Sequence, residues 1–217
     1  MRLAIFDLDN TLIAGDSDHA WGQFLVKKGL VDGENFRRAN DRFYEEYKSG
    51  TLNIIEYLQF SLTPLTHHNM ETLAELHKEF MRDYINPMML PKAQQLLAEH
   101  RAQGDYLLII TATNGFVTRP IASALGVDDI LTTDPEILDN RYTGKFIGIP
   151  TFQKGKVIRL QDWLKEKNFT LDDAYFYSDS INDLPLLEQV PNPIVVDPDA
   201  KLRAVAVERN WKELSLR

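Results

Sequence analysis

Residues 3–11 read Leu3-Ala4-Ile5-Phe6-Asp7-Leu8-Asp9-Asn10-Thr11, an apolar run that ends abruptly in acidic and polar residues. Runs that are apolar over their whole length are typical of strands covered on both faces, as in a parallel sheet. Three later runs have the same form, and each is followed by a polar residue: 106–110, 174–177 and 193–196. Together these runs predict a parallel sheet whose strands end in polar residues.

Helical patterns lie between the predicted strands. Residues 91–103 begin with Pro91 and are followed by Gly104, which is a typical pairing of helix start and helix end. Residues 155–166 place their apolar side chains on one helical face. This alternation predicts a Rossmann-like, doubly wound α/β fold. Residues 135–150 are expected to form a β-hairpin flap instead of a strand of the sheet.

Residues 15–88 interrupt the alternation. The segment contains several helical stretches with aromatic stripes and no convincing strand. It falls between the first strand and the rest of the sheet, so we interpret it as an inserted helical cap. The expected division is a core domain made of residues 1–14 and 89–217, with residues 15–88 as the cap.

The composition is that of an ordinary globular protein, since 44% of its 217 residues are hydrophobic and 26% are charged. No stretch approaches the apolar length of a membrane span. The formal net charge of −8 argues against a nucleic-acid surface and against binding to anionic membranes. The chain has no cysteine, which excludes disulfides and a catalytic thiol. We expect a cytoplasmic protein; the oligomeric state is open, with a monomer favoured.

Four carboxylates follow predicted strands: Asp7 and Asp9 after the first, and Asp179 and Asp183 after the third. Ligands bind at the carboxyl ends of the strands in open α/β sheets. Each aspartate alone could be a turn former or helix cap, the interpretation we adopt for Asp197. Four carboxylates gathered at one edge would repel one another, so we expect a divalent cation with oxygen ligands. Mg²⁺ fits best, because no histidine or cysteine ligand is nearby.

The first motif, Asp7-Leu8-Asp9-Asn10-Thr11 after an apolar strand, resembles that of the haloacid dehalogenase superfamily, whose pattern is D-x-D-x-T. Later motifs match in order over essentially the whole chain. Thr111 fills the Ser/Thr position, Lys154 fills the lysine position, and residues 178–183 resemble G-D-x-x-N-D with Ser178 in place of glycine. The helical insertion resembles the C1-type cap of subfamily IB, the phosphoserine-phosphatase-like group. Asp9 disfavours dehalogenation, because dehalogenases lack this second aspartate.

The resemblance implies a Mg²⁺-dependent phosphatase that works through an aspartyl-phosphate. Asp7 would be the nucleophile and Asp9 the general acid and base. Thr111 and Lys154 would bind the phosphoryl group, with Lys156 as a rival two residues on. The resemblance also implies the metal ligands, which are Asp7, the Asp9 carbonyl and Asp179. Asn182 and Asp183 would support the metal's waters and the phosphoryl pocket.

The cap should bind the leaving group, and the candidate residues for this contact are Asp16, Ser17 and Asp18. Asp16 matches the acidic residue that reads the substrate amine in phosphoserine phosphatases. Residues 51–61, the matching later stretch, contain no arginine or lysine to pair with a substrate carboxylate. An amine-bearing substrate without a carboxylate therefore fits better, and the hypothesis is L-histidinol phosphate, as for some similar enzymes of histidine biosynthesis. Capping of the following helix is the structural alternative for the three residues.

Three alternatives stay open at this point. Phosphoserine remains a candidate substrate if Arg37, Arg38 or Arg42 reaches the pocket. A phosphotransferase would share the first half-reaction and pass the phosphoryl group to an acceptor other than water. A phosphate-sensing module on the same fold is disfavoured, because the first motif and the lysine are intact.

Overall fold

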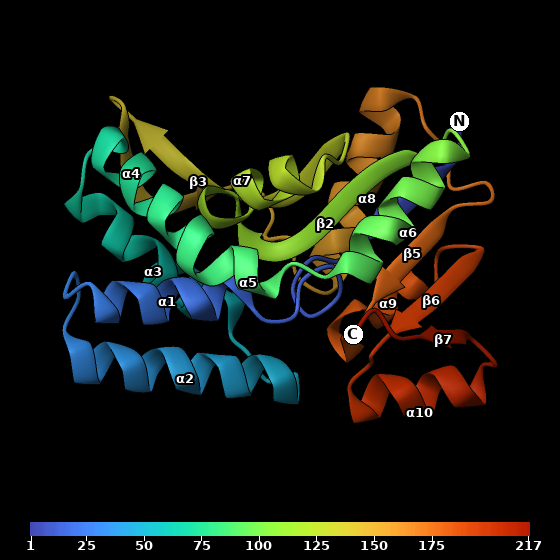
Figure 1. Ribbon diagram of the computed structural model, residues 1–217, viewed down its shortest axis with the longest axis horizontal. Helices are drawn as coiled ribbons and strands as arrows, with labels where there is room; N and C mark the ends of the chain where they lie inside the picture. Colours follow the sequence, from blue (N-terminus) through green and yellow to red (C-terminus); the bar gives the residue numbers. More distant parts are fainter.

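The computed structural model describes residues 1–217 and contains one seven-stranded sheet with the order β4-β3-β2-β1-β5-β6-β7 (Figure 1). Every neighbouring pair is parallel except β3 and β4, which are antiparallel. The predicted α/β fold is confirmed. The strands are β1 (Leu3–Phe6), β2 (Tyr106–Asn114), β3 (Asp129–Leu138), β4 (Arg141–Ile147), β5 (Tyr175–Ser178), β6 (Asn192–Val196) and β7 (Lys212–Leu214).

Helices occupy most of the remaining chain. The α-helices are α1 (Ser17–Lys27), α2 (Gly33–Ser49), α3 (Ile54–Leu62), α4 (Met70–Phe80), α5 (Asn86–Met88), α6 (Pro91–Ala102), α7 (Gly115–Leu125), α8 (Lys154–Lys167), α9 (Leu184–Leu187) and α10 (Ala200–Glu208). Short helical segments of other types are η1 (Thr63–His67), η2 (Met81–Ile85) and η3 (Ile181–Asp183). No helix combines the length and the apolar character that a bilayer crossing requires.

Side chains of β1 alternate between two apolar layers, which explains why its sequence is apolar throughout. Ala4 and Phe6 pack in the layer under α6, α7 and the helices of residues 15–88. Leu3 and Ile5 pack in the opposite layer, under α8, α9 and α10. Both faces of the sheet are therefore buried, as expected for a parallel sheet.

The order of the strands places the chemistry-bearing residues together. From β1 the chain builds outward to β2, β3 and β4, and then returns to the other side of β1 with β5. Strand order reverses beside β1, so the carboxyl ends of β1, β2 and β5 meet at a switch point where α/β proteins bind ligands. Asp7, Thr111 and Asp179 lie at these ends.

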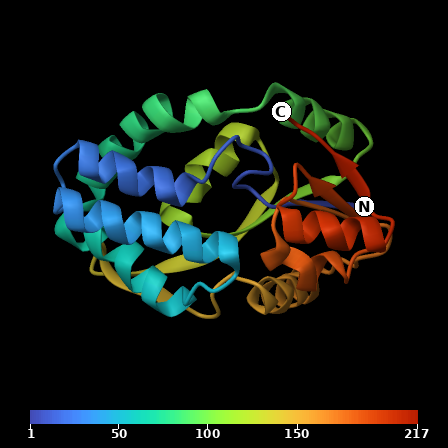
Figure 2. The ribbon, with the colours of Figure 1, turned by 90° about the horizontal axis from the view of Figure 1, so that it is seen from below.

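Residues 15–88 contain only helical elements, α1 to α5 with η1 and η2. Figures 1 and 2 show them gathered toward one end of the molecule, away from β6 and β7. Only the end of α2 reaches α10, where Lys201 Nζ donates to Ser49 O at 2.8 Å. The two junctions of the segment adjoin, since Ala14 N donates to Met88 O at 2.8 Å and Ile13 bridges to Met89. We propose residues 15–88 as the cap and the remainder as the core.

The β-hairpin expected over residues 135–150 is present, but its first strand is longer than predicted. Strand β3 begins at Asp129 and pairs with β2 before turning through Asp139 and Asn140, both of positive φ. The expectation that this region lies outside the sheet is therefore wrong for β3. Strand β4 packs against η1 and α3, so the hairpin supports the cap.

Candidate active site

A buried ion-pair cluster lies at the carboxyl end of β1. Lys156 Nζ is 2.7 Å from Asp7 Oδ1 and 2.8 Å from Asp183 Oδ2. All three residues are at most 3% exposed. Ser178, which replaces the usual glycine of its motif, donates its hydroxyl to Asp183 Oδ2 at 2.7 Å. Lys156 thus supplies a fixed positive charge beside Asp7 in a site that water does not screen.

Lys156, and not Lys154, is the lysine of the site, so the expectation for Lys154 is wrong. Helix α8 begins at Lys154, and residues two apart on a helix point about 200° away from each other. The Lys154 side chain is exposed, whereas Lys156 faces the sheet. Gly155 lets the helix start come close to the preceding loop, because a Cβ there would lie 2.0 Å from Pro150 O.

Asp9 is held by donors from two segments. Its Oδ1 accepts a hydrogen bond of 2.6 Å from Ser17 N at the start of α1. Its Oδ2 accepts from the Thr113 hydroxyl at 2.9 Å and from the Thr111 hydroxyl at 3.5 Å. Burial and the charge of Asp16 raise the pKa of Asp9 to about 6, against these hydrogen bonds, which lower it. A carboxyl group near this pKa can both donate and accept a proton at neutral pH.

The segment after β5 supplies Asp179 and, within η3, Asn182, and the two side chains face different neighbours. Asp179 Oδ1 accepts from the Thr11 hydroxyl at 3.2 Å, so it lies beside the first motif. Asn182 turns toward residues 15–88, because its Nδ2 donates to Tyr47 O at 2.9 Å. Its Oδ1 accepts from Gln153 at 3.1 Å. The geometry therefore joins Asn182 to the last turn of α2.

The oxygen donors at the strand ends fit a hard divalent cation. Burial raises the pKa of Asp7 although Lys156 opposes it, and burial with the charge of Asp7 raises the pKa of Asp179 well above its usual range. The two carboxylates thus lack enough positive charge, which a cation would supply. No group of three or more His, Cys, Asp or Glu side chains is arranged so that side chains alone could hold a metal ion. The expected set requires only Asp7, Asp179 and the Asp9 carbonyl, which suits Mg²⁺ with water ligands.

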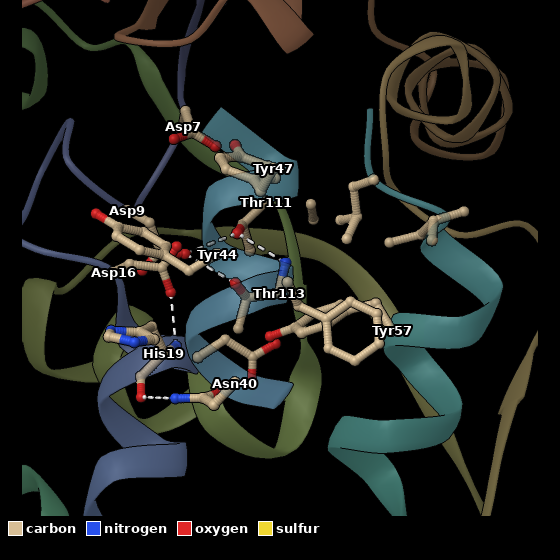
Figure 3. A pocket seen from close by; sticks show the side chains of 15 residues that line it. Asp7, Asp9, Asp16, His19, Asn40, Tyr44, Tyr47, Tyr57, Thr111 and Thr113 are labelled. Atoms are coloured by element: carbon tan, nitrogen blue, oxygen red, sulfur yellow. Dashed lines mark hydrogen bonds between the residues drawn. The ribbon is translucent and has the colours of Figure 1, made fainter. Parts of the chain in front are cut away.

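A cavity opens from this center toward α1, α2 and α3, with an empty volume of about 510 Å³ including space open to solvent (Figure 3). Its lining is acidic and aromatic and includes no lysine or arginine. The acidic residues are Asp7, Asp9, Asp16 and Asp18, and the aromatic residues are Phe43, Tyr44, Tyr47 and Tyr57. Such walls favour a cationic group, through charge and through contact with aromatic faces.

The three residues predicted to bind the leaving group lie in or beside this cavity. For Asp16, the alternative interpretation as a helix N-cap holds as well. Asp16 caps α1 by accepting from His19 N at 2.7 Å, yet it also lines the cavity. Ser17 is fully buried and binds Asp9 through its backbone N–H. Asp18 is 4% exposed and lines the cavity. Burial raises the pKa of both Asp16 and Asp18 to about 7.

Sequence reasoning missed Thr113 and the tyrosines of the cavity. Thr113 follows Thr111 by two residues, and the period of a strand places both hydroxyls on one face. That period was a usable signal. Tyr44 and Tyr57 lie on different helices, α2 and α3, and no local pattern predicts that both line one cavity.

Comparison with known proteins places the chain among hydrolases. A family model described as haloacid dehalogenase-like hydrolase matches residues 4–188. A histidinol-phosphatase of Neisseria meningitidis serogroup C (strain 8013) is 47% identical over 220 residues, covering 100% of this chain and 99% of the relative.

Solved structures agree in fold. A protein of unknown function from Bordetella pertussis Tohama I has a TM-score of 0.93 and 45% identity, covering 100% of this chain and 99% of that one. A phospho-aspartyl intermediate analogue of phosphoserine phosphatase has a TM-score of 0.71 and 16% identity, covering 100% and 93%. At that identity, the second likeness concerns the fold alone.

Proposed function

The chain belongs to the haloacid dehalogenase-like hydrolase family, and from this premise we propose that it is a Mg²⁺-dependent phosphatase acting on L-histidinol phosphate. The resemblance inferred from the first motif is thereby confirmed. The observation that carries the choice of substrate is the cavity lining, which has four aspartates and no lysine or arginine. A leaving group with cationic nitrogen and no carboxylate fits that lining.

The proposed chemistry uses the residues around β1 in two steps. Asp7 attacks phosphorus in line, forming an aspartyl-phosphate as the bond to the ester oxygen breaks. Asp9 gives its proton to that leaving oxygen. Water then attacks the aspartyl-phosphate, Asp9 takes a proton from it, and Asp7 is released with inorganic phosphate. Lys156, which is bonded to Asp7, would offset negative charge at the phosphoryl group, and the Thr111 hydroxyl, which reaches the Asp9 carboxylate, would donate to a phosphoryl oxygen.

Asp7, Asp179 and the Asp9 carbonyl would hold Mg²⁺, which when bound would neutralise phosphoryl oxygens as a Lewis acid. Asp183 would act through Lys156, to which it is bonded. Asn182 has a different proposed role from the one expected, because its amide binds the α2 carbonyl of Tyr47 and thereby fixes the wall of the cavity.

The other functions fit less well. Phosphoserine carries a carboxylate, and the three arginines considered for it lie elsewhere. Arg37 lines a separate hollow between α1 and α2, Arg38 pairs with Glu34, and Arg42 lies over the Phe43 ring. A phosphotransferase would use the same first step. A phosphate sensor would not need the assembled Asp7, Asp9 and Lys156. A role in histidine biosynthesis would place the protein in the cytoplasm.

We expect L-histidinol phosphate to be the best substrate in a panel of small phosphate monoesters assayed with Mg²⁺. Its kcat/KM should exceed that of phosphoserine by about 100-fold or more, because the phosphoserine carboxylate would face carboxylates. The measurement is the initial rate of phosphate release. Equal rates for the two substrates would defeat the substrate proposal, and transfer to an added alcohol would favour a phosphotransferase.

Removal of divalent metal should abolish the phosphatase activity. Dialysis against EDTA should lower kcat at least about 100-fold, because the carboxylates at the strand ends lose the charge that balances them. Mg²⁺ should restore the rate. Ca²⁺ should restore it poorly, because this larger ion takes longer bonds and more ligands. Full activity after exhaustive chelation would contradict the proposed metal site.

A further inference from the structure

Asp18 is a buried carboxylate that the proposed phosphoryl chemistry does not use. It is the second residue of α1 and lines the cavity while being only 4% exposed. Its Oδ1 accepts a long hydrogen bond of 3.4 Å from Asn114 Nδ2. Its Oδ2 is buried without a partner of full hydrogen-bond geometry. A carboxylate in this position is costly to the folded protein unless a ligand pairs with it.

The surroundings of Asp18 are polar, and the one side chain of the cavity lining that can become cationic is His19, which pairs with Asp41. Burial raises its pKa to about 7, with a further contribution from Asp9, and the nearby Tyr57 hydroxyl opposes the shift. No lysine or arginine lines the cavity. The side chain therefore offers an unsatisfied acceptor between an amide and an aromatic ring.

Asp16 and Asp18 lie at different distances from the reacting center. Asp16 lies beside Asp9 in Figure 3, and its charge contributes to the raised pKa of Asp9. Asp18 accepts from Asn114 and has Tyr57 as a neighbour, and Tyr57 lies on the side of the cavity away from Asp9 and Asp16 in Figure 3. The cavity thus has a proximal and a distal acidic position.

The leaving group of histidinol phosphate has two nitrogen-bearing parts, one near the ester oxygen and one farther from it, which matches the proximal and distal acidic positions. Its amine is on the carbon next to the one that carries the ester oxygen, and its imidazole ring is further along the chain. A planar ring with N–H donors suits an acceptor flanked by an aromatic face.

We propose that Asp18, with Asn114 and Tyr57, forms a distal subsite that binds the imidazole ring, while Asp16 binds the proximal ammonium group. This inference rests on the proposed function and assigns the specificity for the ring to one side chain. Asp18 would accept an N–H of the ring through the oxygen that now lacks a partner.

The test compares Asp18→Asn with Asp16→Asn, in which asparagine retains the helix-capping ability of Asp16. Substrates are L-histidinol phosphate and O-phosphoethanolamine, which has the proximal amine and no ring. In Asp18→Asn the ratio of the two kcat/KM values should fall at least about 30-fold toward phosphoethanolamine. In Asp16→Asn the ratio should stay within about threefold while both values fall, because both substrates carry the amine. Glu45→Gln, an exposed charge change on α2, should leave the ratio unchanged.

A second readout separates this inference from the proposed function. 4-Methylimidazole should inhibit p-nitrophenyl phosphate hydrolysis competitively, and its Ki should rise at least about tenfold in Asp18→Asn but not in Asp16→Asn. If wild-type enzyme does not hydrolyse histidinol phosphate but shows these changes in the Ki of 4-methylimidazole, the proposed substrate is wrong and the ring subsite stands. An unchanged substrate ratio in Asp18→Asn, or an unchanged Ki, overturns the distal subsite.

Discussion

Asp7→Asn should lower kcat by about 10⁴-fold or more while leaving the fold intact, because the amide cannot attack phosphorus. The site tolerates the change. Lys156 keeps its partner Asp183, and the backbone hydrogen bond from Asp7 N to Tyr177 O at 2.9 Å does not involve the side chain. The measurement is phosphate release under saturating substrate and Mg²⁺, with thermal unfolding measured on the same preparation.

Asp197→Asn is the matched control. Asp197 also follows a strand of the sheet, but its carboxylate accepts from Leu216 N at 3.0 Å and pairs with Arg217. Asparagine tolerates its positive φ of 42°. We expect its rate to stay within about twofold of wild type, as for substitutions away from a reacting center. Substantial turnover by Asp7→Asn would show that Asp7 is not the nucleophile.

Lys156→Met should damage both stability and activity. The substitution keeps an unbranched side chain one atom shorter than lysine, and it leaves Asp7 and Asp183 as buried carboxylates without a cationic partner. Removing one partner of a buried ion pair costs about 3–5 kcal/mol of the free energy of unfolding. Loss of the charge beside the phosphoryl group should lower kcat by about 10³-fold. Urea denaturation and phosphate release measure the two effects.

Lys154→Met distinguishes the two lysines. Its side chain is exposed, so we expect changes of at most about 0.5 kcal/mol in the free energy of unfolding. Activity should remain close to wild type. The reverse outcome, with Lys154 essential and Lys156 dispensable, would contradict the role proposed for Lys156.

Much of the core could be predicted because its signals are local. Four apolar runs correspond to β1, β2, β5 and β6, and the helical patterns correspond to α6 and α8. Strand β7 (Lys212–Leu214) was missed because a three-residue edge strand with two charged residues carries no apolar pattern. The first half of β3 was missed because Thr132 and Thr133 interrupt its hydrophobicity, although both are buried.

The sequence by itself determined the reaction class, because Asp7, Asp9 and Asp179 follow strands whose apolar pattern already places them at one edge of a sheet. The tertiary structure decided which lysine completes the site, because order along the chain cannot tell which side of α8 faces Asp7. It also decided what surrounds Asp18. Asn114 and Tyr57 reach it from β2 and α3, and a contact between segments so far apart in sequence depends on how the helices pack and not on any local pattern.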